Sequence, residues 1–203
     1  MAAEQKRRDI ADERRRWKLS IADVHPSRLV FLDESGARTD MTRLYGRAPR
    51  GQRVIECAPA GHWCTTTMLC ALRCDRIEAP LVIEGAMDSV VFRGYVERML
   101  VPTLQPDDVV VMDNLSPHKT QGVQEAIEAA GATVRYLPPY SPDFNPIESM
   151  WSKVKQYLRS AAARTQGRLV NAVGDAMRSV TPDDCRGFFA GCGYAGTHYR
   201  EML

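Results

Sequence analysis

Apolar residues fall into short continuous runs in the first two thirds of this chain and into helix-spaced stripes in the last third. Continuous runs of four to eight apolar residues are typical of buried strands, whereas apolar residues three or four positions apart indicate amphipathic helices. The runs predict strands at residues 28–33, 53–57, 65–73, 77–84, 109–113 and 133–137. The stripes predict helices at residues 3–19, 88–100, 119–130, from 145 for about four turns, 167–178 and 182–190.

Local signals refine these boundaries. Residues 35–36, Ser-Gly, are predicted to turn the chain out of the first strand, and Asp88 or Ser89 is predicted to cap the helix that follows. That helix is predicted to carry Val91, Tyr95 and Met99 on one face. Antiparallel-looking strands thus come first, helices and strands then alternate, and helices close the chain. This order predicts an α/β fold with a mixed sheet.

Composition adds little, but the distribution of charge adds more. The 203 residues carry a formal net charge of +2, which is too small to argue for nucleic acid alone. Residues 1–27 are predicted to form a basic helical extension ahead of the domain at 28–203. Basic side chains cluster at Lys6, Arg7, Arg8, Arg14, Arg15, Arg16 and Lys18, at Arg43, Arg47, Arg50 and Arg53, and at Lys153, Lys155, Arg159, Arg164 and Arg168. Such clusters either neutralise phosphates or form a solvated face.

The cysteines and the apolar runs exclude several classes of protein. The chain has six cysteines without a C-x-x-C pair, so we expect neither a structural zinc site nor a disulfide framework. A zinc-binding interaction module is therefore a weak alternative. No run approaches the roughly 18 apolar residues of a membrane span, and the basic N-terminus lacks an apolar signal core. We expect a cytoplasmic protein with no membrane partner.

Two of the predicted strands end in aspartate. Asp33 follows the run at 28–32 and Asp113 follows the run at 109–112. If these strands are neighbours, about 4.8 Å apart, the two carboxylates lie side by side and favour a divalent cation between them. Each aspartate alone is better explained as an ordinary turn residue. Glu34 is an alternative ligand, but it points the other way if the strand continues.

A third acid, Glu148, starts the helix that follows a proline-rich loop. Asn145 at the N-cap, Pro146 at N1 and Glu148 at N3 predict a capping box, which would explain this glutamate without catalysis. The apolar stripe of the helix is predicted to comprise Ile147, Met150, Trp151, Val154, Tyr157 and Leu158. A second face carries Glu148, Ser152, Lys155 and Arg159. A carboxylate in line with two basic side chains suits a metal site beside a phosphate track.

Further side chains are candidates for contacts with DNA. Asn114 either orients Asp113 or makes the turn, and His118 either contacts a scissile phosphate or caps the next helix. The complete set of candidates for DNA contacts is Asn114, His118, Lys119, Lys155, Arg159, Arg47 and Arg50.

The motifs FLDESG, VVVMDNLSPHK and LPPYSPDFNPIESMW together resemble the catalytic domain of DDE transposases. The chain is similar to the bacterial insertion-sequence branch of the Tc/mariner superfamily, the insertion-sequence-630 type, in which 34 residues between the second and third acids are characteristic. The resemblance extends from about residue 28 to about residue 190. It implies a ribonuclease H-like fold, a mixed five-stranded sheet flanked by helices, within the domain at 28–203.

The resemblance also implies a mechanism. Asp33, Asp113 and Glu148 are expected to be catalytic and to bind two Mg²⁺ (or Mn²⁺) ions. The expected reactions are DNA strand cleavage at transposon ends and strand transfer into target DNA, without a covalent enzyme–DNA intermediate. A homodimer in the synaptic complex and a nucleoid-associated location are further expectations.

The chain departs from the family at its N-terminus. Only about 27 residues precede the first strand, which are too few for the helix-turn-helix modules that read the terminal repeats in relatives. A separate helix-turn-helix part encoded in another reading frame, or a truncated copy, are both consistent with this. The alternatives are a ribonuclease H-like nuclease or resolvase, and a catalytically silent DNA-binding or assembly remnant of a transposase.

Overall fold

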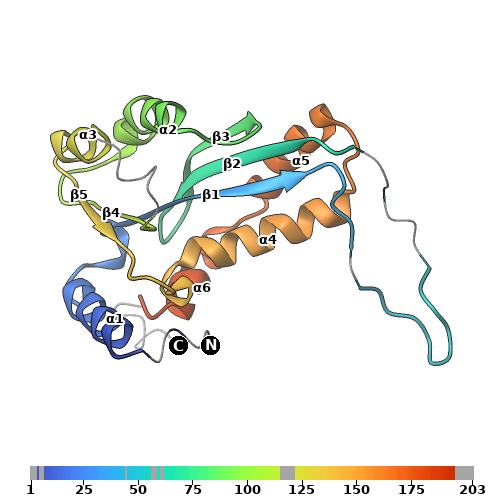
Figure 1. Cartoon of the computed structure of the whole chain (residues 1–203), viewed down its shortest axis with the longest axis horizontal. Helices are drawn as coiled ribbons and strands as arrows, with labels where there is room; N and C mark the ends of the chain where they lie inside the picture. The colour runs from blue at the N-terminus through green and yellow to red at the C-terminus, as the bar shows by residue number, and fades with distance from the viewer. Residues whose placement is uncertain are drawn as a thin grey trace.

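A mixed sheet of five strands, in the order β3-β2-β1-β4-β5, runs through the centre of the molecule (Figure 1). The computed structural model describes residues 4, 7–43, 45–55, 59, 62–114 and 122–194. The strands are β1 (Leu29–Arg38), β2 (Thr65–Leu72), β3 (Ile77–Glu84), β4 (Val109–Met112) and β5 (Thr133–Tyr136). The pairs β1–β2 and β2–β3 are antiparallel, and the pairs β1–β4 and β4–β5 are parallel. The mixed five-stranded sheet of the predicted fold class is therefore confirmed.

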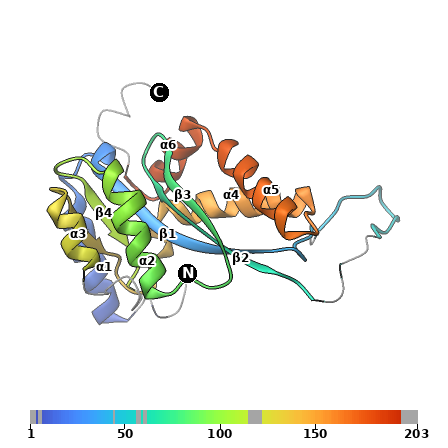
Figure 2. The same ribbon diagram turned by 90° about the horizontal axis from the view of Figure 1, so that it is seen from above.

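Helices cover both faces of this sheet (Figures 1 and 2). One face carries α1 (Arg8–Ile21), α4 (Pro146–Ala161), α5 (Gln166–Arg178) and α6 (Pro182–Gly191). The other face carries α2 (Ser89–Tyr95), α3 (Val123–Ala129) and the π-helical turn η3 (Val96–Leu100). Short 3₁₀ turns are η2 (Pro26–Arg28), η4 (Val101–Thr103) and η6 (Pro142–Phe144). The predicted strands at 65–73, 77–84, 109–113 and 133–137 and the helices at 167–178 and 182–190 are confirmed to within about two residues.

The alternation along β1 decides which helices its side chains meet. Leu29 and Phe31 belong to the core beneath α4, whereas Val30 and Leu32 belong to the core beneath α2 and α3. Because successive side chains point to opposite faces of a sheet, Asp33 faces α4 and Glu34 faces the other layer. This agrees with the expectation that Glu34 points away if the strand continues.

The predicted turn at residues 35–36 is wrong. β1 continues to Arg38, and Gly36 pairs with Thr67 of β2 in an unbroken antiparallel ladder. A long partner strand supplies the backbone hydrogen bonds that keep even a serine and a glycine extended. The predicted strand at 53–57 is also not found: residues 53–55 are exposed and not in a strand, and residues 56–57 lie outside the described ranges.

Three predicted helices have different boundaries. The helix predicted at 3–19 begins at Arg8 and ends at Ile21. Its buried residues are Ile10, Trp17 and Ile21. The helix at 88–100 is capped by Asp88 as predicted and ends in a π-turn, and its buried residues are Phe92, Tyr95, Val96 and Leu100. Val91 is instead 39% exposed. The third, α3, is described from Val123, and residues 119–121 of the predicted helix lie outside the described ranges.

Two further expectations bear on the class of protein. In the part of the chain that the structure describes, no helix is long and apolar enough to cross a membrane. The cysteines of this part are free thiols: Cys64, Cys70, Cys74, Cys185 and Cys192.

Candidate functional site

The β1–β4 ladder aligns two acids. Leu29 pairs with Val109 and Phe31 with Val111, and the same register continued by two residues places Asp33 level with Asp113. Asp33 lies within β1 and is 8% exposed, while Asp113 directly follows β4 and is half-buried. Level residues on parallel neighbours point to the same face, so both carboxylates belong to the α4 side of the sheet.

Glu148 comes to this face from α4, which packs on β1 and β2. Pro146 is the first helical residue and Glu148 the third, and the buried neighbours Ile147, Met150 and Trp151 fix the helix on the sheet. Glu148 itself is exposed. The predicted apolar stripe is confirmed except for Tyr157, which is 40% exposed.

The capping box predicted for α4 is wrong. Among the described residues the buried Asn145 side chain makes no capping hydrogen bond; the amide of Glu148 instead donates to the Asn145 carbonyl oxygen at 3.2 Å. A capping box is found at α6, between Thr181 and Asp184. Helix capping, the non-catalytic explanation considered for Glu148, therefore does not account for this residue.

Burial and neighbouring acids together raise the pKa of Asp33 to about 8. Loss of solvent is the largest cause, followed by the charges of Glu148, Glu34 and Asp113; the Glu34 amide, which donates to Asp33 Oδ1 at 2.9 Å, acts in the opposite direction. Both Asp113 and Glu148 therefore lie within electrostatic reach of the buried Asp33. Carboxylates in this relation disfavour one another's ionised form until a positive charge joins them.

The donor chemistry of this group fits a divalent cation. Hard cations such as Mg²⁺ and Mn²⁺ prefer carboxylate oxygens, and a cation would offset the repulsion that raises the pKa of Asp33. Within the described ranges, no three His, Cys, Asp or Glu side chains form a ready-made coordination cluster. Cys70, which pairs with Asp33 across β1–β2, is fully buried, and burial raises the pKa of its thiol well above the ordinary value. The acids rather than this protonated thiol are the suitable ligands.

The candidates for DNA contacts occupy three places. Asn114 is exposed directly after Asp113, and Lys155 and Arg159 are half-buried along α4 in the row that begins with Glu148. Arg47 and Arg50 are exposed on the segment between β1 and β2, which projects from the body of the molecule (Figures 1 and 2). His118 and Lys119 lie outside the described residues.

Sequence reasoning did not connect the projecting segment with α4. Arg159 lines a groove of about 460 Å³ together with Arg43, Tyr45, Gln156 and Ser160. Arg43 donates to Ser160 Oγ at 3.0 Å, so the base of the segment is fixed to the C-terminal half of α4. The two arginines are 116 residues apart in the chain, and no local pattern relates them.

The fold is shared with solved transposase structures. The Mos1 mariner paired end complex with Mn matches at a TM-score of 0.70 and 14% identity, over 96% of this chain and 61% of that chain. The Mos1 strand transfer complex matches at a TM-score of 0.69 and 13% identity, over 95% of this chain and 59% of that chain. With the observed sheet order, this likeness confirms the predicted ribonuclease H-like fold.

Sequence relatives point the same way. The transposable element Tcb2 transposase of Caenorhabditis briggsae is 24% identical over 102 residues, which are 48% of this chain and 37% of that protein. The chain thus spans less than two thirds of the length of these relatives. The model of the DDE superfamily endonucleases matches residues 28–170, a range that contains Asp33, Asp113 and Glu148. The chain belongs to the DDE superfamily endonucleases.

Proposed function

We propose that this chain is the catalytic domain of a transposase that cleaves DNA at transposon ends and transfers the freed strand into target DNA. Membership in the DDE superfamily endonucleases and the match to the Tcb2 transposase support this activity. The likeness to Mos1 in a paired end complex and in a strand transfer complex supports both stages. The motifs around the three acids favour the bacterial insertion-sequence branch, the insertion-sequence-630 type.

One observation carries the proposal: the buried Asp33 lies within electrostatic reach of Asp113 and Glu148. These three residues are the proposed catalytic acids and the ligands of two Mg²⁺ or Mn²⁺ ions. When bound, such ions supply Lewis-acid activation of the attacking oxygen and charge relief at the leaving oxygen. The contribution of the chain is to hold two carboxylates on paired strands and the third on a helix that packs against those strands.

The bond changes follow from the chemistry of phosphodiesters. In cleavage, a water oxygen forms a bond to phosphorus and the bond to the 3′ oxygen breaks, which leaves a 3′-hydroxyl on the transposon strand. In strand transfer, that 3′ oxygen bonds to a target phosphorus and a target 3′ oxygen leaves. Each step exchanges one phosphorus–oxygen bond for another, so no cofactor is oxidised or reduced.

Basic and polar side chains around the acids would hold the DNA. We assign backbone contacts to Arg47 and Arg50 on the projecting segment, to Lys155 and Arg159 on α4, and to Asn114, His118 and Lys119 after β4. A homodimer is proposed for the synaptic complex, because two transposon ends have to be held together. End recognition by a separate helix-turn-helix part from another reading frame, and a nucleoid-associated location, belong to the same proposal.

The test is a strand-transfer assay with pre-cleaved duplexes that carry 3′-hydroxyl ends from the DNA flanking the coding sequence. We expect product only with Mg²⁺ or Mn²⁺, and we expect Asp33→Asn, Asp113→Asn and Glu148→Gln each to lower the rate by about a hundredfold or more. Asp175→Asn, on the surface of α5, serves as a matched control for charge removal.

Three outcomes would contradict the proposal in different ways. Activity that survives all three substitutions would remove the acids from the mechanism. Metal-dependent nicking without joining would favour a ribonuclease H-like nuclease. DNA binding without any cleavage would favour a catalytically silent remnant.

A further inference from the structure

The loop that precedes α4 is fixed by residues far away in the sequence. It carries the helix on which Glu148 sits, yet its end at Asn145 is not tied down by a side-chain cap among the described residues. Arg14 of α1 holds the loop earlier, at Ser141 and Asp143. Its Nη1 donates to Ser141 Oγ at 2.7 Å and to Asp143 Oδ1 at 2.9 Å, and its Nη2 donates to Asp143 Oδ2 at 2.6 Å.

The Arg14 contact is geometrically specific. A guanidinium that meets both oxygens of one carboxylate fixes direction as well as distance, which a lysine cannot do. The Arg14 guanidinium carbon also lies 4.1 Å from the centroid of the Phe144 ring, a cation–π contact. The Arg14 side chain is only 13% exposed, and its hydrogen bond holds the pKa of Asp143 below the ordinary value. Arg14 is thus committed to the loop rather than available to a phosphate.

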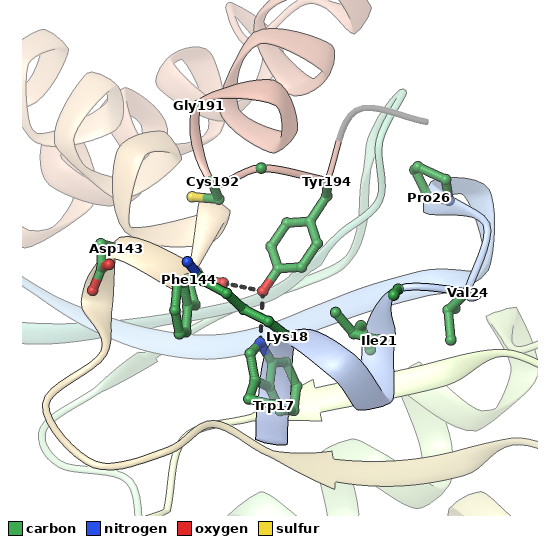
Figure 3. A pocket seen from close by; sticks show the side chains of 12 residues that line it. Trp17, Lys18, Ile21, Val24, Pro26, Asp143, Phe144, Gly191, Cys192 and Tyr194 are labelled. Carbon is green, nitrogen blue, oxygen red and sulfur yellow. Dashed lines mark hydrogen bonds between the residues drawn. The ribbon is translucent and has the colours of Figure 1, made fainter. Parts of the chain in front are cut away.

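A second anchor lies beside the first. The Tyr194 hydroxyl donates to the carbonyl oxygen of Phe144 at 2.7 Å, and Trp17 Nε1 donates to the same hydroxyl at 3.2 Å (Figure 3). Trp17, Phe144 and Tyr194 are all buried, and they form part of the wall of a cavity of about 540 Å³ between α1 and the end of α6. The Tyr194 ring also packs on Phe31, with centroids 5.1 Å apart.

These contacts connect the two segments that lead to Asp33 and to Glu148. Phe31 lies two residues before Asp33 on β1, and Phe144 lies four residues before Glu148. Tyr194 touches both, and α1 holds the loop from its outer side through Arg14 and Trp17. A shift of the loop would have to break a bidentate ion pair and a buried hydrogen bond before it could move the first turn of α4.

We propose that α1 and Tyr194, which follows α6, together brace the active site, with Arg14, Trp17 and Tyr194 as positioning residues that set Glu148 against Asp33. The inference rests on the proposed function, since it concerns the geometry of the same three acids. None of the three positioning residues is a catalytic residue: each acts through the loop at 138–146.

The experiment compares Arg14→Met with Arg15→Met, which removes an exposed arginine from the same helix, and with the conservative Arg14→Lys. Hydrogen exchange of the amides at 140–148 is measured first, because it needs neither metal nor DNA. We expect faster exchange in Arg14→Met, an intermediate rate in Arg14→Lys and the wild-type rate in Arg15→Met.

Metal affinity and chemistry are measured next, well below the melting temperature. We expect the Mn²⁺ concentration at half-maximal thermal stabilisation to rise by about tenfold in Arg14→Met. The single-turnover rate with pre-cleaved duplex DNA should fall by about 10- to 100-fold, with the dissociation constant for that DNA unchanged. A purely structural contact would lower the melting temperature and leave these quantities as they are.

Unchanged exchange at 140–148, or an unchanged Mn²⁺ midpoint and single-turnover rate in a folded Arg14→Met protein, would contradict the positioning role of Arg14. Should Arg14→Met fail to fold, Asp143→Asn breaks the same ion pair from a side chain that is 48% exposed. A wild-type protein without metal-dependent strand transfer would instead overturn the proposed function alone, because the exchange measurement does not depend on activity.

Discussion

The two ends of the β1–β4 ladder each bury an aspartate, and they compensate the charge differently. At the amino end of β4, Asp108 is fully buried, and its Oδ2 accepts from Arg73 Nη2 at 2.6 Å and from the Gln105 amide at 2.8 Å. Arg73 in turn donates to Glu78 at 2.6 Å. At the other end, the charges that act most strongly on Asp33 are those of Glu148, Glu34 and Asp113, which are all acidic.

This difference separates a structural acid from a functional one. The Arg73 guanidinium balances the charge of Asp108 within the fold, so no cation from outside is required, although Asp108 Oδ1 accepts no hydrogen bond among the described residues. A buried acid among other acids is most stable when a cation joins it, so the fold is prepared for a ligand at the cost of its own stability. Removal of a charged side chain should therefore lower the free energy of unfolding at the Asp108 end and raise it at the Asp33 end.

The largest effect on stability is expected at the Asp108 end of the ladder. Arg73→Met leaves Asp108 and Glu78 without the guanidinium that they share, and we expect the free energy of unfolding to fall by about 4 kcal/mol. Urea denaturation at pH 7 measures it. The matched double variant Arg73→Met/Asp108→Leu removes the stranded charge and should recover part of the loss; no recovery would mean that packing rather than charge dominates.

The opposite sign is expected for Asp33→Asn in metal-free protein. Because the folded-state pKa is raised to about 8, the folded state holds a proton that the unfolded state loses near its ordinary value, and stability falls as the pH rises between them. We expect Asp33→Asn to raise the free energy of unfolding by about 3 kcal/mol at pH 8 and to change it little at pH 4.

Mn²⁺ provides the complementary measurement on the same variant. We expect the ion to raise the melting temperature of the wild type and to have a much smaller effect on Asp33→Asn. Equal stabilisation of both proteins would place the cation elsewhere and would remove the contrast between the two ends of the ladder.

Asp184, which lies at the surface, provides a reference for the effects of the buried Asp33 and Asp108 on stability. Asp184 forms an ion pair with Lys153 and completes the capping box of α6, and the hydrogen bond from Lys153 is the largest cause that lowers its pKa to about 2. Its stabilisation is present above the ordinary pKa and is lost as the pH falls toward 2. We expect Asp184→Asn to cost about 1 kcal/mol at pH 7 and progressively less as the pH falls through 2, measured by thermal unfolding across pH. A pH-independent cost would mean that the charge is irrelevant.

The smallest effect is expected for Glu34→Gln. Glu34 lies next to Asp33 but faces the α2 and α3 layer, so it influences the site through charge alone. We expect the strand-transfer rate to stay within about threefold of the wild type, which corresponds to less than 1 kcal/mol in the barrier. A loss as large as that of Asp33→Asn would make Glu34 a ligand and would show that β1 twists at this point.

The sequence predicted what depends on local pattern. The apolar run at 109–112 is a strand buried on both faces, and Asp113 follows it as expected. The stripe of α4 placed Glu148 on a different face from Met150 and Trp151. These features follow from periodicity, which a single strand or helix carries by itself.

Tertiary contacts account for what was missed. β1 passes through a serine and a glycine because β2, which begins 27 residues after the end of β1, pairs with both. The loop before α4 is fixed by Arg14, 129 residues before Asp143, rather than by the neighbouring Asn145. In the sequence Arg14 is one of several basic residues on a charged helix, and no local signal distinguishes it from Arg15.

The register of β1 and β4 has a consequence for how such chains can change. The ladder, not the connecting chain, keeps Asp33 and Asp113 level, so length changes within the exposed residues 45–55 between β1 and β2 should leave the two acids aligned. One residue inserted between Phe31 and Asp33 would instead turn Asp33 toward the opposite layer. The projecting segment can therefore be lengthened or shortened in evolution or by engineering. The number of residues between the start of each strand and its aspartate cannot change without turning the carboxylate away from the site.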